Sequence, residues 1–251
     1  MLEEIKGLLE GLHLRGMNAS IESILVEAEQ QGKAISDVLL ELLKSEYGDR
    51  QERALEARMK RSKLPWPWTL DTFPFEKQPG VIKSQIMGLA KLDFIERSEN
   101  LIFIGKPGRG KSGIAMGLLR LALLNGYRGR FYNAQDMLNE LYASLADRST
   151  SKLMNTLSQY DVLLIDELGY LTLTQEQTNI FFKLIDMRYK RKATLITTNL
   201  DFPAWYDVFK QKELVDALLD RFQHHCTTIR IKGPSLRTNS EESEDSDDSE
   251  A

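Results

Sequence analysis

A short glycine-rich stretch combines residue types and a spacing that bind phosphate groups. The stretch "GKPGRGKSG" covers residues 105–113 and matches G-x-x-x-x-G-K-[ST]. Its glycines allow backbone N–H groups to turn toward an anion, and the helix expected after it points its positive end at the same place. Lys111 is expected to reach the outer phosphates of a nucleoside triphosphate, and Ser112 to bind Mg²⁺. The predicted nucleotide-binding residues of this loop are Gly105, Lys106, Pro107, Gly108, Arg109, Gly110, Lys111, Ser112 and Gly113.

Two adjacent acids form the second candidate group, in "DVLLIDELGY" at residues 161–170. Asp166 is predicted to hold Mg²⁺, usually through water, as Walker-B aspartates do. Glu167 is predicted to polarise a water molecule for attack on the terminal phosphate. Apolar strands often end in acids, so the pair gains its meaning from the phosphate loop that precedes it. The two acids together favour hydrolysis over phosphate transfer to a small metabolite.

Asn199 and Arg221 complete the predicted catalytic set with Glu167. Asn199 follows the buried run "TLITT" and is expected to hydrogen-bond the attacking water or the γ-phosphate; a turn asparagine is the other interpretation. Arg221, in "ALLDRFQHH" at 217–225, lies near a predicted helix end. It either pairs with a surface acid or enters the site of a neighbouring subunit, where it stabilises transition-state charge.

Five short apolar runs are expected to position these residues. They are "LIFI" at 101–104, "RFYN" at 130–133, "VLLI" at 162–165, "TLITT" at 194–198 and "TTIRI" at 227–231. Runs that alternate with helical stretches and are apolar on both faces predict an α/β fold, with a mostly parallel five-stranded sheet covered on both sides. Ligands of such sheets bind at the carboxyl ends of the strands, where each motif falls.

The first 65 residues show helical patterns only. "NASIESILVEAEQQG" at 18–32 predicts a helix that stops at Gly32, and "SDVLLELLKSEYG" predicts a second, capped by Ser36 and stopped at Gly48. "LPWPW" at 64–68 breaks the helical pattern. The predicted organisation is a small all-helical N-terminal domain at 1–65, a linker at 66–80, a phosphate-loop domain at 81–237 and a disordered acidic tail at 238–251.

Composition separates the tail from the rest of the chain. The net charge of the 251 residues is −4, but the last 14 residues hold seven acids, and the remainder has 33 bases and 30 acids. The tail is expected to be solvated, or to compete with nucleic acid for a basic surface. No apolar run approaches ~18 residues, so no membrane span is expected. The single cysteine, Cys226, suits a reducing cytoplasm, and "HHC" at 224–226 is interpreted as a strand start rather than a metal site.

With the stretches quoted above, and with "LHLRGM" at 12–17, "LDFIER" at 92–97 and "TTNL" at 197–200, the chain resembles the IstB family. These are AAA+ helper ATPases of insertion-sequence transposition, related to DnaC-type helicase loaders. The resemblance covers about residues 5–237. It implies a P-loop AAA+ domain at 81–237, Mg²⁺-dependent ATP hydrolysis and homo-oligomers that form with ATP. It also implies assembly on double-stranded DNA and recruitment of a transposase.

Two departures from the family pattern bear on the site. Lys106 and Arg109 stand where the family usually has proline and threonine, which leaves nucleotide preference and turnover open. The family commonly ends in "GESYR", whereas this chain has "GPSLR" at 233–237. The resemblance implies that Arg237 contacts the nucleotide.

Basic segments are the candidates for DNA contact, although a charge run is often only a solvated face. No base-reading module is recognisable, so contact with phosphates and little sequence reading are expected. The candidates are Arg50, Arg53, Arg58, Lys60, Arg61, Lys63, Arg148, Lys152, Arg188, Lys190, Arg191 and Lys192. The alternatives to a transposition ATPase are a DnaC-like replicative helicase loader, a phosphotransferase of small metabolites, and a DNA-binding module with a vestigial loop.

Overall fold

The computed structural model describes residues 1–169, 173–209 and 211–237. The chain divides into two compact units, Met1–Arg58 and Met59–Ala251. The predicted acidic tail and Tyr170 of the second motif lie outside the described residues. Within the described part, no helix is both long and apolar enough to cross a membrane.

The N-terminal unit is helical, as the sequence predicts. Its helices are α1 (Leu2–Gly11), α2 (Arg15–Gln31) and α3 (Ile35–Ser62), and the last of these continues past the unit boundary. Gly32 ends α2 in the left-handed conformation, with φ 63°. Buried Glu46 on α3 accepts a hydrogen bond of 2.9 Å from the backbone N–H of Gly16, which ties the start of α2 to α3.

Both predicted boundaries of the second helix are wrong. α3 begins at Ile35, so Ser36 lies in its first turn and not before it, and α3 does not stop at Gly48 but continues to Ser62. A glycine inside a helix costs only about 1 kcal/mol relative to alanine, and it ends a helix when the chain turns left-handed there. Ion pairs between Glu46 and Arg50 and between Asp49 and Arg53 span the glycine at i,i+4 spacing. These pairs and the helix-forming residues that follow outweigh the single unfavourable position.

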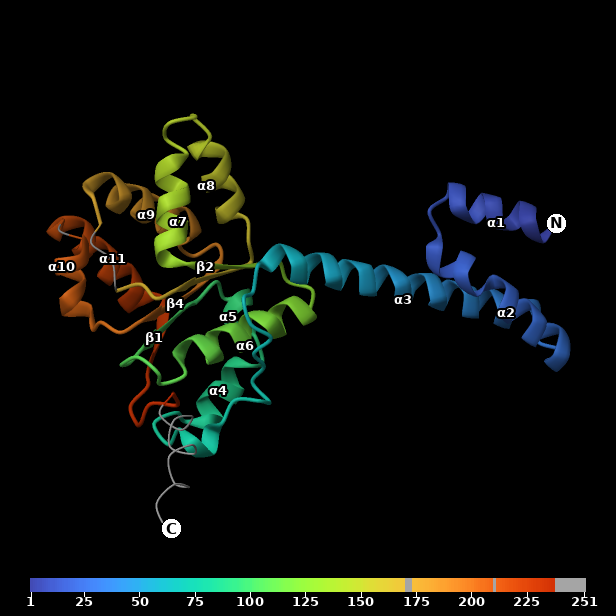
Figure 1. Cartoon of the computed structure of the whole chain (residues 1–251), viewed down its shortest axis with the longest axis horizontal. Coiled ribbons are helices and arrows are strands. Elements are labelled where there is room, and N and C mark those ends of the chain that lie inside the picture. The colour runs from blue at the N-terminus through green and yellow to red at the C-terminus, as the bar shows by residue number, and fades with distance from the viewer. Residues whose placement is uncertain (170–172, 210, 238–251) are drawn as a thin grey trace, which may run out of the picture. The chain divides into compact units, whose positions relative to one another are not determined.

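The second unit contains the predicted five-stranded parallel sheet (Figure 1). Its strands are β1 (Asn100–Ile104), β2 (Gly129–Asn133), β3 (Val162–Asp166), β4 (Ala193–Thr198) and β5 (Cys226–Arg230). The strand order is β2-β3-β4-β1-β5, and every neighbouring pair is parallel. All five predicted apolar runs are therefore strands, and β1 lies between β4 and β5 rather than at an edge.

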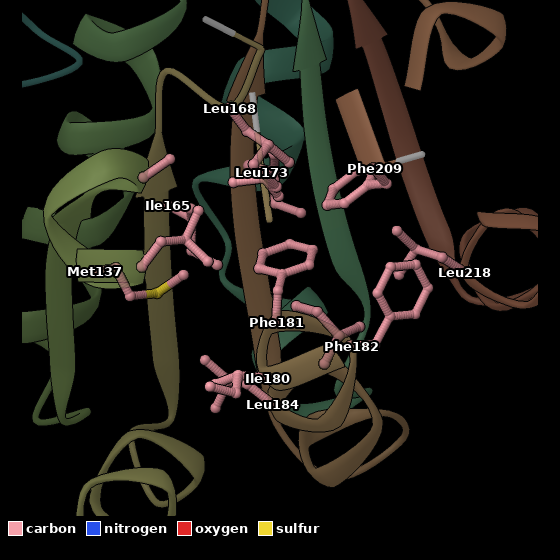
Figure 2. Packing of buried hydrophobic residues seen from close by; sticks show 14 of the residues in the cluster. Met137, Ile165, Leu168, Leu173, Ile180, Phe181, Phe182, Leu184, Phe209 and Leu218 are labelled. Carbon is pink, nitrogen blue, oxygen red and sulfur yellow. The ribbon is translucent and has the colours of Figure 1, made fainter. Parts of the chain in front are cut away.

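Helices cover both faces of this sheet. They are α4 (Lys83–Leu89), α5 (Asp93–Glu96), α6 (Lys111–Leu124), α7 (Ala134–Ala143), α8 (Thr150–Ser158), α9 (Gln175–Arg188), α10 (Trp205–Phe209) and α11 (Lys212–His224), with 3-10 turns η1 (Phe75–Lys77) and η2 (Phe202–Ala204). Ile102 and Ile104 of β1 join a core cluster with α7 to α11, whereas Leu101 and Phe103 join another with α4 to α6. Figure 2 shows the first cluster, with Phe181 between Ile165 of β3 and Phe209. The alternation explains why the inner strands β1, β3 and β4 are buried along their whole length, whereas the edge strands β2 and β5 are only partly buried.

The segment that we predicted as a linker, 66–80, is packed onto the second unit. Leu70 and Phe73 are buried in the cluster around α6, and Gln78 is fully buried. The tight fit of this segment is visible at Gly117 of α6, where an added Cβ would lie 2.9 Å from the Leu70 side chain. The proline pattern correctly predicts a break in the helix, but the apolar residues after it belong to the core.

Candidate nucleotide site

The phosphate loop joins the carboxyl end of β1 to the start of α6. Gly108 and Gly110 have φ angles of 75° and 87°, which is the left-handed region that favours glycine. At Gly110 an added Cβ would lie 2.6 Å from the Phe73 ring, so both conformation and space require glycine there. The Lys111 ammonium donates a 3.0 Å hydrogen bond to the carbonyl of Lys106 and so closes the loop upon itself.

Asp166 lies at the centre of a group of hydroxyl donors. It is buried at the end of β3. Its Oδ1 accepts hydrogen bonds from Ser112 Oγ at 2.7 Å and from Thr197 Oγ1 at 2.5 Å. Burial raises the pKa of Asp166, whereas the two hydroxyl donors oppose the rise. The site therefore joins the phosphate loop, β3 and β4 through one carboxylate.

Glu167 follows Asp166 but faces outward. Its backbone is left-handed, with φ 63°, and its N–H donates a 3.0 Å hydrogen bond to Thr197 Oγ1. Asn133, at the end of β2, donates through Nδ2 to Glu167 Oε2 at 3.0 Å. The exposed carboxylate is thus held by its neighbour on the sheet edge while its other oxygen remains available to a water molecule.

The pKa of Lys111 is set by its burial and by the charges around it. Burial lowers the pKa of Lys111, and the nearby cations Arg109 and Arg237 lower it further, while Asp166 and Glu167 raise it. A triphosphate brings several negative charges to this place, which favours the protonated lysine and relieves the repulsion between the three cations. The site is therefore electrostatically suited to a polyanion.

Asn199 lies just past β4 at the same edge. Its Oδ1 is buried and has no hydrogen-bond partner within the described residues. Gly169 comes close to it, since a Cβ added there would lie 2.5 Å from this oxygen. A buried amide oxygen without a partner is uncommon in folded proteins, and it usually marks a place for a water molecule or ligand. Asn199 is thus positioned to contact one.

A cavity of about 980 Å³ collects most of the predicted site, a size suited to a nucleotide. The predicted residues that line it are Pro107, Gly108, Arg109, Gly110, Lys111, Ser112, Gly113, Asp166, Glu167, Asn199 and Arg237. Gly105 and Lys106 are in the loop but not in this lining, and Gly105 instead approaches Ile231.

The segment after β5 is fastened across the phosphate loop. Arg109 donates through Nη1 to the Ile231 carbonyl at 3.2 Å, and the Leu236 N–H donates to the Gly108 carbonyl at 2.8 Å. Gln78 Nε2 donates to the carbonyls of Arg109 at 3.3 Å and Pro234 at 2.8 Å. These bonds bring Arg237 to the cavity, so the segment that carries it forms part of the site wall.

Arg221 lies elsewhere in its own chain. It is on α11, donates to Asp186 Oδ1 and to the Ala217 carbonyl, both at 2.8 Å, and does not belong to the described lining of the cavity. About 30% of its side chain is exposed. The sequence leaves open whether Arg221 forms a surface ion pair or acts in a neighbouring subunit. The structure shows the ion pair, and because the pair is accessible to solvent, Arg221 could also leave it to contact a neighbouring subunit.

Arg188 is the one DNA candidate that the structure overturns. Its side chain is buried. It donates to the carbonyls of Leu157, Tyr160 and Ala193 and to Thr194 Oγ1. Burial lowers the pKa of Arg188 to about 9, which still leaves the guanidinium charged at neutral pH. It serves to satisfy backbone carbonyls inside the fold, since a buried cation without acceptors would be strongly unfavourable.

The other basic candidates differ in how they are engaged. Arg50 pairs with Glu46, Arg53 pairs with Asp49, and Lys192 pairs with Asp161. Arg58 is half-buried and has a partner of its own. Arg50 is exposed although paired, and the other exposed candidates are Lys60, Arg61, Lys63, Arg148, Lys152, Lys190 and Arg191. These exposed side chains stay candidates for phosphate contact.

The donor set at Asp166 fits magnesium. Mg²⁺ is usually held by one or two protein oxygens, by waters and by phosphate oxygens of the substrate, rather than by a cage of protein ligands. Ser112 Oγ and Asp166 Oδ1 supply two such oxygens 2.7 Å apart. The described residues contain no cluster of three or more His, Cys, Asp or Glu residues that would suit another kind of metal site.

Sequence reasoning missed several residues of this site. Thr197 and Asn133 hold the two acids, and Trp66 and Trp68 line the cavity. Both polar residues stand at the carboxyl ends of predicted strands. Because ligands of parallel sheets bind at these ends, the last residues of every predicted strand are candidates for the site. The tryptophans stand among the prolines of "LPWPW", whose pattern predicts a break in the helix and gives no sign of a cavity.

Comparisons with known proteins agree with this geometry. The chain matches a family model described as IstB-like ATP binding protein over residues 7–244. It is 35% identical to a protein of Pseudomonas aeruginosa named for ATP binding in insertion sequence IS21, covering 94% of this chain and 89% of that protein. A protein of Geobacillus stearothermophilus, named likewise for insertion sequence IS5376, is 34% identical and covers 94% of each chain. The DnaC helicase loader structure superposes with a TM-score of 0.56 at 24% identity, over 66% of this chain and 98% of that chain.

Proposed function

The chain belongs to the IstB-like ATP-binding protein family, and we propose that it is a magnesium-dependent ATPase that assembles on DNA for insertion-sequence transposition. The observation that carries the proposal is the hydrogen bond between Ser112 of the phosphate loop and Asp166 of β3, with Glu167 beside them at the same cavity. A glycine-rich anion site, a magnesium donor pair and a water-activating acid together favour hydrolysis of a nucleoside triphosphate.

Binding of ATP rests on the loop and on α6. The N–H groups at the start of α6 and the Lys111 ammonium would contact the phosphates, because the helix end and the lysine both favour negative charge. Ser112 and Asp166 would hold Mg²⁺, which supplies charge neutralisation to the phosphates when bound. Lys111 must then exchange its bond to the Lys106 carbonyl for the phosphate oxygens.

Hydrolysis rests on Glu167 and its neighbours. The Glu167 carboxylate accepts a proton from the attacking water as the new P–O bond forms and the bond to ADP breaks. Asn133 orients this carboxylate. The unpartnered Oδ1 of Asn199 would accept a hydrogen bond from the water, or the Nδ2 group of the same side chain would donate one to the γ-phosphate. The chain's own contribution is thus to position a water molecule and to receive its proton.

Arg221 is proposed to act on the nucleotide of a neighbouring subunit. It is outside the described lining of its own cavity, and its pairing with exposed Asp186 can be exchanged at an interface. An arginine supplied in this way stabilises transition-state charge. Mixing Arg221→Ala with Lys111→Ala protein should restore part of the ATPase activity, because each supplies what the other lacks at a shared interface. Absence of rescue at every mixing ratio, with assembly intact, would count against this role.

The proposed partners are double-stranded DNA, bound with little sequence preference, and a transposase. The support is the insertion-sequence context of the relatives and the exposed basic residues, among them Arg148 and Lys152. A DnaC-like helicase loader is the alternative, but the likeness to DnaC concerns the fold alone. Binding to unrelated duplexes of equal length should be similar and should weaken with salt, by a slope of about −0.9 per neutralised phosphate in log K against log salt.

The ATPase assignment is tested by Mg²⁺-dependent ATP hydrolysis with and without DNA. Lys111→Ala should lose ATP binding or turnover while keeping its thermal unfolding profile, because Lys111 is a ligand group and not part of the core. Wild-type turnover in Lys111→Ala, with normal ATP affinity, would refute the assignment. Lys91→Ala, at an exposed lysine outside the cavity lining, provides the matched control and should behave as wild type.

A further inference from the structure

The cavity beside the phosphate loop is lined by two chemically different groups of residues. One group suits a triphosphate and comprises Lys111, Ser112 and Asp166. The other group is aromatic and comprises Trp66, Trp68 and Phe73. A nucleotide is divided in the same way, into a charged triphosphate and a flat aromatic base. The polar group is used by the proposed function, whereas the aromatic group has no role in it.

The two tryptophans differ from the phenylalanine in their exposure. Phe73 is buried against the loop, close to Gly110, and therefore belongs to the core. Trp66 and Trp68 remain 62% and 41% exposed although they line the cavity. Large aromatic side chains that remain partly exposed beside a polar cavity keep ring surface in contact with water, and a flat ligand can bury that surface.

Trp68 lies close to the residues that follow the phosphate loop. Its ring lies at the first turn of α6, where a Cβ added to Gly113 would be 3.8 Å away. Gly113 follows directly after Lys111 and Ser112, so the ring stands beside the residues proposed to hold the phosphates. Pro67 between the two tryptophans fixes one backbone angle and thereby restricts their relative placement.

We propose that Trp66 and Trp68 form a stacking platform for the nucleobase of the bound nucleotide. This inference rests on the proposed ATP site and assigns its base-binding residues. The hydroxyl of Thr72, which lines the same cavity, is already engaged with Thr69, through Oγ1 at 2.9 Å and the carbonyl at 3.2 Å. Stacking recognises the face of a base and not its hydrogen-bonding edge, so the two tryptophans distinguish a nucleotide from a bare polyphosphate.

The test compares two ligands that share the polyphosphate and differ in the base. Affinities for the non-hydrolysable ATP analogue AMP-PNP and for tripolyphosphate, both with Mg²⁺, are measured by calorimetry on the full chain. The double variant Trp66→Leu/Trp68→Leu should bind AMP-PNP about 5- to 150-fold more weakly, the range typical of base–aromatic stacking. Its affinity for tripolyphosphate should change less than about 2-fold, since no phosphate contact is altered. The matched control Tyr142→Leu removes an exposed aromatic outside the cavity lining and should change neither.

Two further measurements separate stacking from damage to the fold. Trp66→Phe/Trp68→Phe keeps aromatic faces and should recover most of the AMP-PNP affinity. Nucleotide should quench the fluorescence of Trp66 and Trp68, whereas buried Trp205 provides a constant background. Unchanged AMP-PNP affinity in the leucine variant, or equal weakening of both ligands, would overturn the platform. If the wild-type protein binds neither ligand, the proposed ATP site itself fails.

Discussion

The hydroxyl of Thr197 is expected to control how well the site uses magnesium. It is fully buried on β4, donates to Asp166 Oδ1 at 2.5 Å and accepts the Glu167 N–H at 3.0 Å. Thr197→Val keeps the shape of the side chain and removes both hydrogen bonds. Thr197→Ser keeps the hydroxyl and removes a methyl group. The pair of variants therefore separates the hydrogen bonds from the packing.

The two variants should have similar stability and different activity. A hydrogen bond to a charged group contributes about 1.5–3 kcal/mol, so Thr197→Val should lower the free energy of unfolding by about 2 kcal/mol. Thr197→Ser should lower it by about 1 kcal/mol through the lost methyl group. Loss of a partner that orients a metal ligand typically reduces metal affinity or activity 10- to 100-fold, so Thr197→Val should show a reduction of about that size.

The assay is ATP hydrolysis as a function of Mg²⁺ concentration, with thermal unfolding measured on the same preparations. Thr197→Val should need more Mg²⁺ for half-maximal activity or lose maximal rate, while Thr197→Ser should stay within a few-fold of wild type. Equal Mg²⁺ dependence in the two variants would refute the argument that Thr197 positions Asp166. A shared loss in both would show that the methyl group, and hence packing, is what matters.

Three other predictions follow from particular contacts. Arg188→Leu should lower the free energy of unfolding by about 3 kcal/mol or more, because buried carbonyls lose their donor, whereas exposed Arg191→Leu should change it by less than about 0.5 kcal/mol in the same denaturant titration. Gly110→Ala should lose ATP binding in calorimetry, since its left-handed backbone and the adjacent Phe73 ring both exclude a Cβ; near-wild-type affinity would contradict the loop geometry. Glu167→Gln should bind ATP and leave DNA more slowly than wild type after a competitor chase, because a lost general base commonly slows hydrolysis ~10²-fold or more; equal release rates would separate hydrolysis from DNA release.

The sheet could be predicted from sequence because its signal is local. The inner strands β1, β3 and β4 are short runs that are buried on both faces, which is what a parallel sheet covered by helices imposes, and the edge strands β2 and β5 carry a weaker form of the same signal. The helix boundary at Gly48 could not be predicted in the same way. Gly32 and Gly48 look alike in sequence, but only Gly32 adopts a left-handed backbone, and the i,i+4 ion pairs around Gly48 continue the helix.

Residue type alone did not decide which charges are exposed. "RYKRK" reads as a uniformly basic segment, yet Arg188 points into the fold while Lys190 and Arg191 face solvent. The difference arises because α9 ends at Arg188, where its side chain donates to the carbonyls of Leu157, Tyr160 and Ala193. Ala193 is near in sequence, but Leu157 and Tyr160 belong to another part of the chain, so a charge pattern cannot identify this set of acceptors.

The strand order explains how the scattered motifs become one site. In sequence the phosphate loop follows the first strand, Asp166 ends the third and Asn199 follows the fourth, and this order does not say which strands are neighbours in the sheet. In the order β2-β3-β4-β1, the loop after β1 stands beside the end of β4, and β4 stands beside β3. Among the described contacts of β4, Thr197 is the residue that hydrogen-bonds both the Asp166 carboxylate and the Glu167 backbone.

This arrangement also links nucleotide binding to the catalytic acid. Ser112, Asp166 and Thr197 are joined by hydrogen bonds, and Thr197 and Asn133 contact the backbone and side chain of Glu167 in turn. If Ser112 and Asp166 held magnesium, as proposed, their mutual hydrogen bond would have to be exchanged for contacts to the ion. Thr197 would then join the residue proposed to hold the metal to the residue proposed to activate water, since it contacts both Asp166 and the Glu167 backbone.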